Sequence, residues 1–156
     1  MSFQDIVRMY QRPLYWYIRR VVLVHEDTED ILQETFIKAY RHLWMLRDDS
    51  ALKPWLYRIA TNEVNRYFRK HRETLSLEDV SGMDFISCDS PSPGKAYEVV
   101  SSALLRMSPL QREVFCLKYY EDMDYDSISR ITGSGKNTLM VSYHEARKKI
   151  EKEIDK

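Results

Sequence analysis

Residues 108–150 read SPLQREVFCLKYYEDMDYDSISRITGSGKNTLMVSYHEARKKI, and the helix signals in this segment set the architecture of the C-terminal half. Ser108, Pro109 and Gln111 combine an N-cap, a proline at the first helical position and a capping-box glutamine. These residues predict a helix that starts at Pro109 and runs to about Tyr120.

The rest of that segment predicts two further helices joined by a tight turn. Asp124 can cap a short helix that stops at Gly133, and a last helix begins after Gly135. The last helix carries its apolar residues at spacings of 4, 3 and 4, namely Leu139, Tyr143, Ala146 and Ile150. This is the helix-turn-helix pattern, which is common in DNA-binding proteins but is shared with other two-helix hairpins.

The N-terminal part also predicts helices. Apolar residues recur with a period near 3.6 over residues 3–22, and Pro13 should kink or split that run. Asp27 or Thr28 can cap a second helix. A third helix is predicted with Pro54 in its first turn, where a missing backbone donor costs little.

The charge of the chain is balanced overall but divided along its length. The 156 residues hold 24 Lys and Arg against 24 Asp and Glu. Counted by segment, residues 1–75 carry a net charge of +3, residues 76–100 carry −4 and residues 101–156 carry +1. The neutral total therefore does not exclude nucleic-acid binding, because the acidic middle segment cancels two slightly basic flanks.

The acidic middle segment also holds the residues that interrupt regular structure. Residues 90–94 read SPSPG, which is typical of a linker. We therefore predict an all-α protein with two small helical domains, residues 1–73 and 98–156. An acidic, flexible Ser/Pro-containing linker, residues 74–97, would join them.

Several functional classes are disfavoured by what the sequence lacks. No apolar run approaches the length of a membrane span, and no signal peptide is visible, so we expect a cytoplasmic protein with no membrane insertion of its own. Cys88 and Cys116 provide neither a disulfide framework nor zinc-ligand spacing. No catalytic residue, metal site or cofactor is predicted, and we expect the protein not to be an enzyme.

One predicted helix mixes cations with aromatic residues. The cations are Arg58, Arg66, Arg69 and Lys70, and the interleaved aromatic residues are Trp55, Tyr57, Tyr67 and Phe68. Cations neutralise phosphates and aromatic rings stack on unpaired bases, so the mixture is compatible with nucleic-acid binding. Taken alone, the mixture favours an amphipathic helix with Trp55, Ile59 and Phe68 in the core and a solvated basic face.

Three segments together resemble a known family. They are residues 27–41 (DTEDILQETFIKAYR), 54–62 (PWLYRIATN) and 108–115 (SPLQREVF). In order and spacing they are similar to the extracytoplasmic-function (ECF, group IV) sigma factors of the sigma-70 family. The resemblance implies a region 2-like bundle of three to four helices, a linker and a region 4-like helix-turn-helix domain. It also implies a promoter-specificity subunit of bacterial RNA polymerase that directs transcription initiation.

The resemblance implies roles for particular residues. Core polymerase would be bound through its β′ coiled coil and β subunit, and the residues of this chain would be Asp30, Gln33, Glu34 and Phe36. The loop at residues 46–53 and the helix after it would recognise and melt the −10 element with Leu46, Lys53, Trp55, Arg58, Asn62, Arg66, Arg69 and Lys70. The −35 element would be read by Lys136, Asn137, Thr138, Met140, Val141, His144, Arg147 and Lys148. Promoter DNA and an anti-sigma factor are the other expected partners.

The last helix departs from the family pattern, which usually reads G-T-V-[KR]-S-R-x-x-R-A-R. Here residues 137–147 read NTLMVSYHEAR, and the positions that are commonly Lys or Arg, Ser, Arg and Arg are Met140, Val141, Ser142 and Glu145. We expect an unusual −35 sequence, with Met140 and Val141 placed to contact thymine methyl groups. Two alternatives stay open: a helix-turn-helix regulator that acts without polymerase, and a degenerate sigma-like interaction protein.

Overall fold

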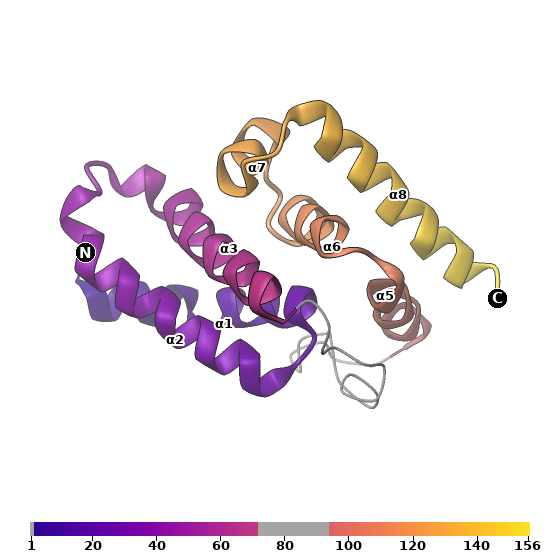
Figure 1. Ribbon diagram of the computed structural model, residues 1–156, viewed down its shortest axis with the longest axis horizontal. Helices are drawn as coiled ribbons and strands as arrows, with labels where there is room; N and C mark the ends of the chain where they lie inside the picture. Colours follow the sequence, from indigo (N-terminus) through magenta and orange to yellow (C-terminus); the bar gives the residue numbers. More distant parts are fainter. Residues whose placement is uncertain (1, 72–93) are drawn as a thin grey trace. The chain divides into compact units, whose positions relative to one another are not determined.

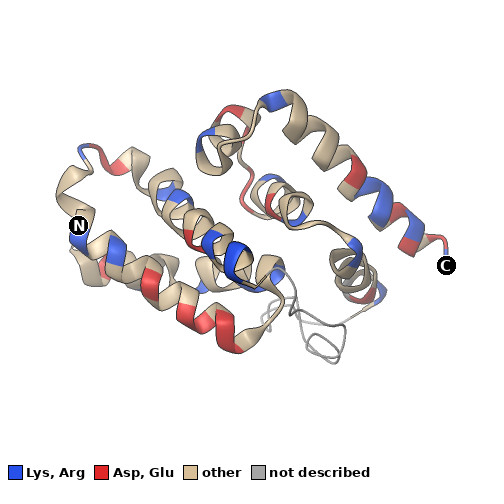
Figure 2. Ribbon diagram, viewed as in Figure 1, with Lys and Arg blue, Asp and Glu red and all other residues tan. Residues whose placement is uncertain are grey.

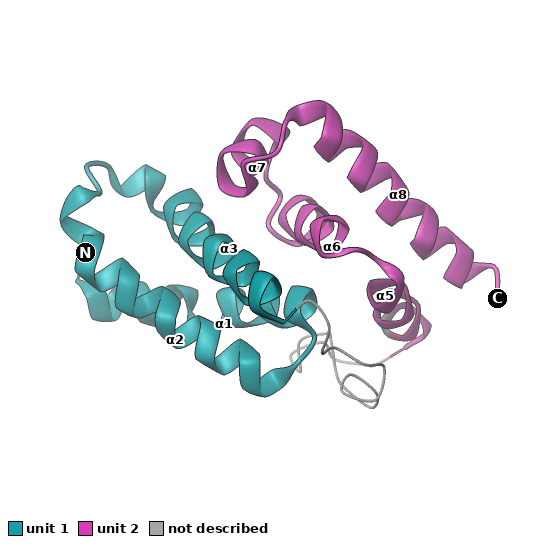
Figure 3. Ribbon diagram, viewed as in Figure 1, with its two compact units in different colours: residues 1–83 teal, residues 84–156 magenta. Residues whose placement is uncertain are grey.

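The computed structural model describes residues 2–71 and 94–156, and every regular element in these two ranges is a helix (Figure 1). The chain divides into two compact units, residues 1–83 and 84–156 (Figure 3). The predicted all-α class with two helical domains is therefore confirmed. Most of the predicted linker lies outside the described residues, and residues 95–97, which we assigned to it, belong to a helix.

Unit 1 is built from three long helices that all pack against one another: α1 (Phe3–Val22), α2 (His25–His42) and α3 (Leu52–Lys70). Two single turns of 3₁₀ helix, η1 (Leu43–Met45) and η2 (Asp49–Ala51), connect α2 to α3. The predicted turn between the second and third helices is thus partly helical. Within the described residues, no helix is long and apolar enough to cross a membrane.

All three helices contribute to the core of unit 1, and α2 supplies Ile31, Leu32 and Ala39. The fully buried apolar residues that α1 and α3 contribute include Leu14, Ile18, Val21, Leu56, Ala60 and Val64. The hydroxyls of Tyr17 and Thr61 share a buried hydrogen bond of 2.7 Å, and the Tyr17 and Tyr57 rings lie 5.2 Å apart. A buried hydroxyl pair satisfies both polar groups and fixes the register of α1 against α3.

Two local predictions for unit 1 were wrong. First, Pro13 does not split α1, which is one continuous helix; the proline lies on its exposed side, where the carbonyl that loses its partner can be solvated. Second, α2 begins at His25 with Val24 as its N-cap, and no side chain caps it. Asp27 and Thr28 therefore lie inside the first turn, where the Thr28 hydroxyl donates to the Val24 carbonyl at 2.7 Å.

Residues 94–156 of unit 2 form four α-helices: α5 (Lys95–Arg106), α6 (Pro109–Phe115), α7 (Tyr125–Thr132) and α8 (Lys136–Ile154). A π-helical turn, η3 (Cys116–Tyr120), extends α6, so the predicted helix does reach Tyr120 but changes type on the way. α5, α6 and α7 all pack against α8. The longest helix of the unit is therefore its central support.

The predicted helix caps and the predicted helix end in unit 2 are confirmed by the hydrogen bonds and the backbone conformation. Ser108 and Gln111 form a reciprocal capping box, with backbone amide to side-chain oxygen distances of 3.1 and 3.2 Å. The Asp124 carboxylate accepts from the Ser127 amide at 2.8 Å. Gly133 ends α7 with φ of 79°, a left-handed conformation that glycine adopts without steric cost.

α6 places two charged residues in the core of unit 2. Arg112 donates hydrogen bonds to the carbonyls of Leu104 and Met107, while burial lowers its pKa to about 10. Burial raises the pKa of Glu113 to about 8, against the weaker opposing effect of Arg112. Oε1 of Glu113 has no hydrogen-bond partner among the described residues. The neutral form of Glu113 is therefore favoured near neutral pH.

Candidate functional site

The exposed side of α2 is polar and largely acidic in its N-terminal half, as the red segments of Figure 2 show. Asp30 and Gln33 are exposed, and Glu34 is half-buried. Asp30 and Glu34 are one helical turn apart and therefore lie on the same side of the helix. These three residues are the polar part of the predicted polymerase-binding surface.

Phe36, the fourth residue of that predicted surface, lies elsewhere on α2. Its side chain is half-buried, and its ring meets the ring of Phe3 on α1 edge to face, with the centroids 6.4 Å apart. Residues 30 and 36 are about 120° apart around an ideal helix. The structure therefore separates Phe36 from Asp30 and Glu34 and uses it to hold α1 against α2.

The outer side of α3 carries a basic face that we define as Trp55, Arg58, Asn62, Arg66 and Arg69, spaced 3, 4, 4 and 3 residues apart. The last four side chains are exposed and Trp55 is half-buried. Figure 2 shows the cations of this helix in blue along its length. Five of the residues predicted to bind the −10 element are thus brought together on one side of one helix.

The aromatic residues of α3 fall into two groups, buried and half-buried. Tyr57 is completely buried and Tyr67 is 8% exposed, so neither ring is free to stack on a base. Trp55 and Phe68 are half-buried and keep part of their rings accessible. Only Trp55 among these aromatic residues was assigned to the −10 site, and alternating charged and aromatic residues do not reveal which rings the other two helices cover.

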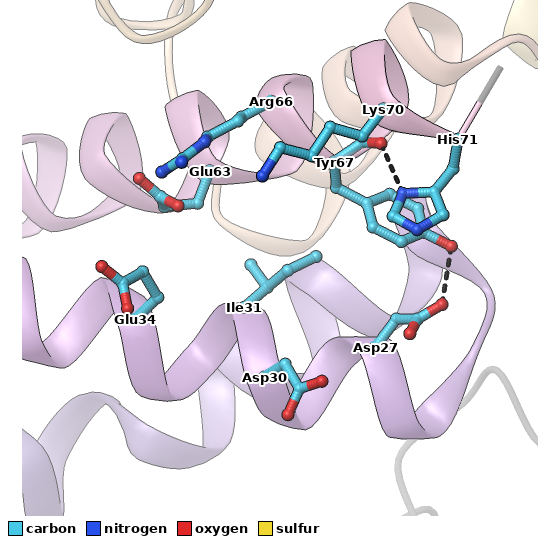
Figure 4. A pocket seen from close by; sticks show the side chains of 9 residues that line it. All are labelled: Asp27, Asp30, Ile31, Glu34, Glu63, Arg66, Tyr67, Lys70 and His71. Atoms are coloured by element: carbon cyan, nitrogen blue, oxygen red, sulfur yellow. Dashed lines mark hydrogen bonds between the residues drawn. The ribbon is translucent and has the colours of Figure 1, made fainter.

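A hollow of about 340 Å³ lies between α2 and α3 (Figure 4). On the α2 side its lining includes Asp30 and Glu34, and on the α3 side it includes Arg66 and Lys70. In Figure 4 the side chains of Arg66 and Lys70 extend along α3, with Arg66 beside Glu63, while Asp30 and Glu34 lie across the hollow on α2. The structure therefore joins two predicted sites, because residues assigned to polymerase and residues assigned to DNA line the same hollow.

Hydrogen bonds and stacking order the end of this hollow. The Tyr67 hydroxyl donates to Asp27 Oδ2 at 2.8 Å, and Nδ1 of His71 donates to the Tyr67 carbonyl at 2.9 Å (Figure 4). The His71 and Tyr67 rings stack with centroids 4.4 Å apart. In the middle of the hollow, Glu63 of α3 forms an ion pair with Lys38 of α2. The Tyr67–Asp27 hydrogen bond and the Lys38–Glu63 ion pair therefore link α2 to α3 on the two sides of the hollow's lining.

The loop between α2 and α3 contains the remaining residues assigned to the −10 element. Leu46 and Lys53 are half-buried, and Lys53 lies about 140° around the helix from Arg58, away from the basic face. The loop is shaped by Asp48, whose carboxylate accepts from the Ser50 amide at 3.0 Å, and this bond lowers the pKa of Asp48. Trp44 is 78% exposed at the start of the loop, and the sequence pattern predicted no role for it.

In unit 2, α8 exposes all eight residues predicted to read the −35 element, while Leu139 and Ala146 on its opposite side are buried. Lys136 forms an ion pair with Asp126 of α7. Arg147 lines a separate hollow of about 370 Å³ beside aromatic residues of α6 and η3. The predicted set is therefore accessible, but two of its three Lys and Arg residues, Lys136 and Arg147, have neighbours within the unit.

The residues that the structure describes contain no group of three or more His, Cys, Asp or Glu placed to hold a metal ion. Cys116 is a free thiol buried in the core. The accessible chemistry of both units thus consists of charged, amide and apolar side chains on helix faces. A basic helix face in one unit and a helix-turn-helix in the other are both features found in DNA-binding proteins.

Comparison with known proteins gives the family. Residues 6–74 match the model for Sigma-70 region 2, and residues 97–150 match the model for Sigma-70, region 4. The chain is 27% identical over 153 residues to the ECF RNA polymerase sigma factor SigM of Bacillus subtilis, covering 96% of this chain and 93% of the relative. It is 29% identical to an ECF RNA polymerase sigma-E factor of Haemophilus influenzae, covering 98% and 87%.

A solved structure agrees with these relatives. The sigma factor RpoE of Bartonella quintana, determined in complex with the anti-sigma factor NepR, superposes with a TM-score of 0.76 at 25% identity, covering 98% of this chain and 96% of that chain. The chain belongs to the sigma-70 family, in its extracytoplasmic-function group. Its function is that of a promoter-specificity subunit of RNA polymerase in transcription initiation.

Proposed function

We propose a division of labour between the two units. In this proposal residues 1–73 bind core polymerase and open the −10 element, residues 98–156 read the −35 element, and residues 74–97 connect them. The polar side of α2 would bind the β′ coiled coil of the polymerase, with a further contact to the β subunit. The basic face of α3 and the loop before it would hold the melted strand.

The observation that carries this proposal is the charge arrangement around the hollow between α2 and α3. Asp27, Asp30 and Glu34 line the α2 side, and Arg66 and Lys70 line the α3 side together with Glu63, whose carboxylate is paired with Lys38. The carboxylates repel phosphate and attract a basic protein surface, while the cations attract phosphate. Polymerase and DNA would therefore bind on neighbouring edges of one groove, and a bound polymerase would position the opened strand on α3.

The basic face of α3 has the composition that strand capture needs. Arg58, Arg66 and Arg69 are exposed cations for backbone phosphates, and Asn62 is an exposed amide between them. The accessible part of Trp55 offers a surface for an unstacked base. Holding an unpaired base offsets part of the cost of opening the duplex.

We further propose an anti-sigma factor as a partner, since the structurally similar RpoE was determined bound to NepR. Binding of such a partner would compete with polymerase for the exposed helix surfaces described above. The proposed activity is binding and positioning alone, with no catalytic step and no metal or cofactor, and its place is the cytoplasm.

The test is run-off transcription with core polymerase, the full chain and a library of promoter sequences. We expect promoter-dependent initiation that the double variant Gln33→Ala, Glu34→Lys reduces at least tenfold, since a tenfold loss needs only about 1.4 kcal/mol of binding free energy. Gln4→Ala, an exposed glutamine on α1, and Glu151→Lys, an exposed glutamate on α8, are matched controls that should initiate normally. Absence of initiation from every template, or an unaffected double variant, would contradict the proposal.

A further inference from the structure

The outward side of α8 has an unusual composition for a helix that enters DNA. Asn137, Val141, His144 and Lys148 recur at spacings of 4, 3 and 4 residues, and Met140 adjoins them. All five side chains are exposed, with Met140 at 46% and Val141 at 61%. We call these five residues the reading face of α8.

Two cations of α8, Lys136 and Lys149, are engaged within the unit, whereas Arg147, Lys148 and Lys152 toward its C-terminal end are exposed. Lys136, the one cation within residues 136–146, forms an ion pair with Asp126. Lys149 points to the other side, where its ammonium donates to the Arg106 carbonyl at 2.8 Å and to Gln111 Oε1 at 2.7 Å. The first three turns of the reading face therefore present an amide, two apolar side chains and an imidazole.

The major groove gives these side chains specific counterparts. Guanine is read most often by Arg or Lys through O6 and N7, and the first three turns of the reading face contain neither. Asparagine forms paired hydrogen bonds with N6 and N7 of adenine, and apolar side chains contact the C5-methyl group of thymine. The composition therefore fits A·T base pairs much better than G·C base pairs.

We propose that α8 reads an A·T-containing −35 element, with Asn137 on adenine and with Met140 and Val141 against thymine methyl groups. This inference rests on the proposed role of unit 2 as the −35 reader, and it names the base pairs that unit 2 selects. Lys148, one turn beyond His144, would contact a backbone phosphate and fix the position of the helix in the groove.

The form of the exposed apolar surface favours DNA over a protein partner. It consists of two adjacent side chains bordered by the polar Asn137, Thr138 and His144. A stable protein interface takes about 20–30 residues from each side, whereas a thymine methyl group needs only one or two neighbours. Gly133 ends α7 and lets α8 start in a new direction after a three-residue turn, so the reading face is part of a helix-turn-helix (Figure 1).

The test uses the full chain bound to core polymerase and a promoter library randomised at the −35 region. Selection should return elements that contain adjacent A·T pairs. Replacing single thymines in them with deoxyuracil removes only the methyl group, and we expect about fourfold weaker promoter binding for each methyl group that α8 touches. Met140→Ala or Val141→Ala should make binding insensitive to one of these replacements. Ile154→Ala, which removes a 53% exposed apolar side chain near the end of the same helix, should stay sensitive.

The outcomes separate this inference from the proposed function. Absence of initiation from every template would contradict the role as a promoter-specificity subunit. Promoter-dependent initiation from a G·C-only −35 element, or binding that ignores every thymine-to-deoxyuracil change, would overturn the inference alone. Initiation that is indifferent to the −35 sequence, together with weaker binding of a protein partner by Met140→Ala, would also overturn it and identify the face as a protein interface.

Discussion

The buried carboxyl group of Glu113 makes the stability of unit 2 depend on pH. Its side chain is 2% exposed, and desolvation raises its pKa from 4.5 to about 8. The folded protein therefore keeps a proton over a pH range in which the unfolded chain has lost it. The stabilisation from protonation is fully present below pH 4.5 and is lost as the pH rises through about 8.

The size of the effect follows from the pKa difference. Within that window each pH unit changes the free energy of unfolding by about 1.4 kcal/mol. Between about pH 6 and about pH 8, unit 2 should lose about 2 kcal/mol, which is a large share of the stability of a small domain. Glu113→Gln removes the titrating group while it keeps the shape of the side chain. The variant should therefore lack this pH dependence and be more stable than the parent protein above pH 8.

The tryptophans make the measurement specific to one unit. Trp16, Trp44 and Trp55 all lie in unit 1, so their fluorescence follows the unfolding of unit 1, whereas far-UV circular dichroism follows both units. Denaturant unfolding at a series of pH values should show the Glu113→Gln difference by circular dichroism alone. Glu151→Gln, at an exposed position of α8, is the control. Equal pH dependence of the parent protein and Glu113→Gln over this range would refute the reasoning.

Three further changes test other parts of the structure. Arg66→Ala should reduce the slope of log affinity for promoter DNA against log salt concentration by about 0.7, because one phosphate contact to a single strand is lost. Lys152→Ala is the control and should leave the slope unchanged. Equal slopes for Arg66→Ala and the parent protein would show that Arg66 does not contact DNA. Tyr17→Phe should destabilise unit 1 by about 1 kcal/mol, measured by tryptophan fluorescence, because it leaves the buried Thr61 hydroxyl without its partner. Gly133→Ala should destabilise unit 2 by about 1–2 kcal/mol, because residue 133 has a left-handed backbone that alanine adopts only with strain. The space around Gly133 is open, so the added methyl group itself causes no clash. Circular dichroism measures the effect, and an unchanged unfolding midpoint would contradict it.

Local signals were sufficient for most helices and for several of their ends. The Ser108 capping box, the Asp124 cap and the Gly133 stop involve residues within four positions of one another, so the sequence alone predicts them. The start of α2 was missed because Val24 provides no capping side chain, and two better caps lie just beyond it. The start of α5 was missed because a linker composition extends up to it.

The candidate surfaces were predictable to different degrees. Exposure of Arg58 and Asn62 follows from helix periodicity, and so does exposure of the predicted −35 residues on α8. Burial of Tyr57 and Tyr67 does not follow, because it depends on which side of α3 the other two helices cover. Phe36 was assigned to a binding surface on the basis of a motif, and only the packing of α1 shows its contact with Phe3.

The sequence by itself determined the helical class, the division of charge along the chain, the helix ends of the helix-turn-helix and the family motifs. Each of these depends on residues that lie close together in the chain. The tertiary structure decided which residues meet. It placed carboxylates of α2 opposite the cations of α3, paired Lys136 with Asp126 and buried Glu113 without a partner for Oε1. These features depend on contacts between helices, and contact between distant residues is set by packing, which no local pattern specifies.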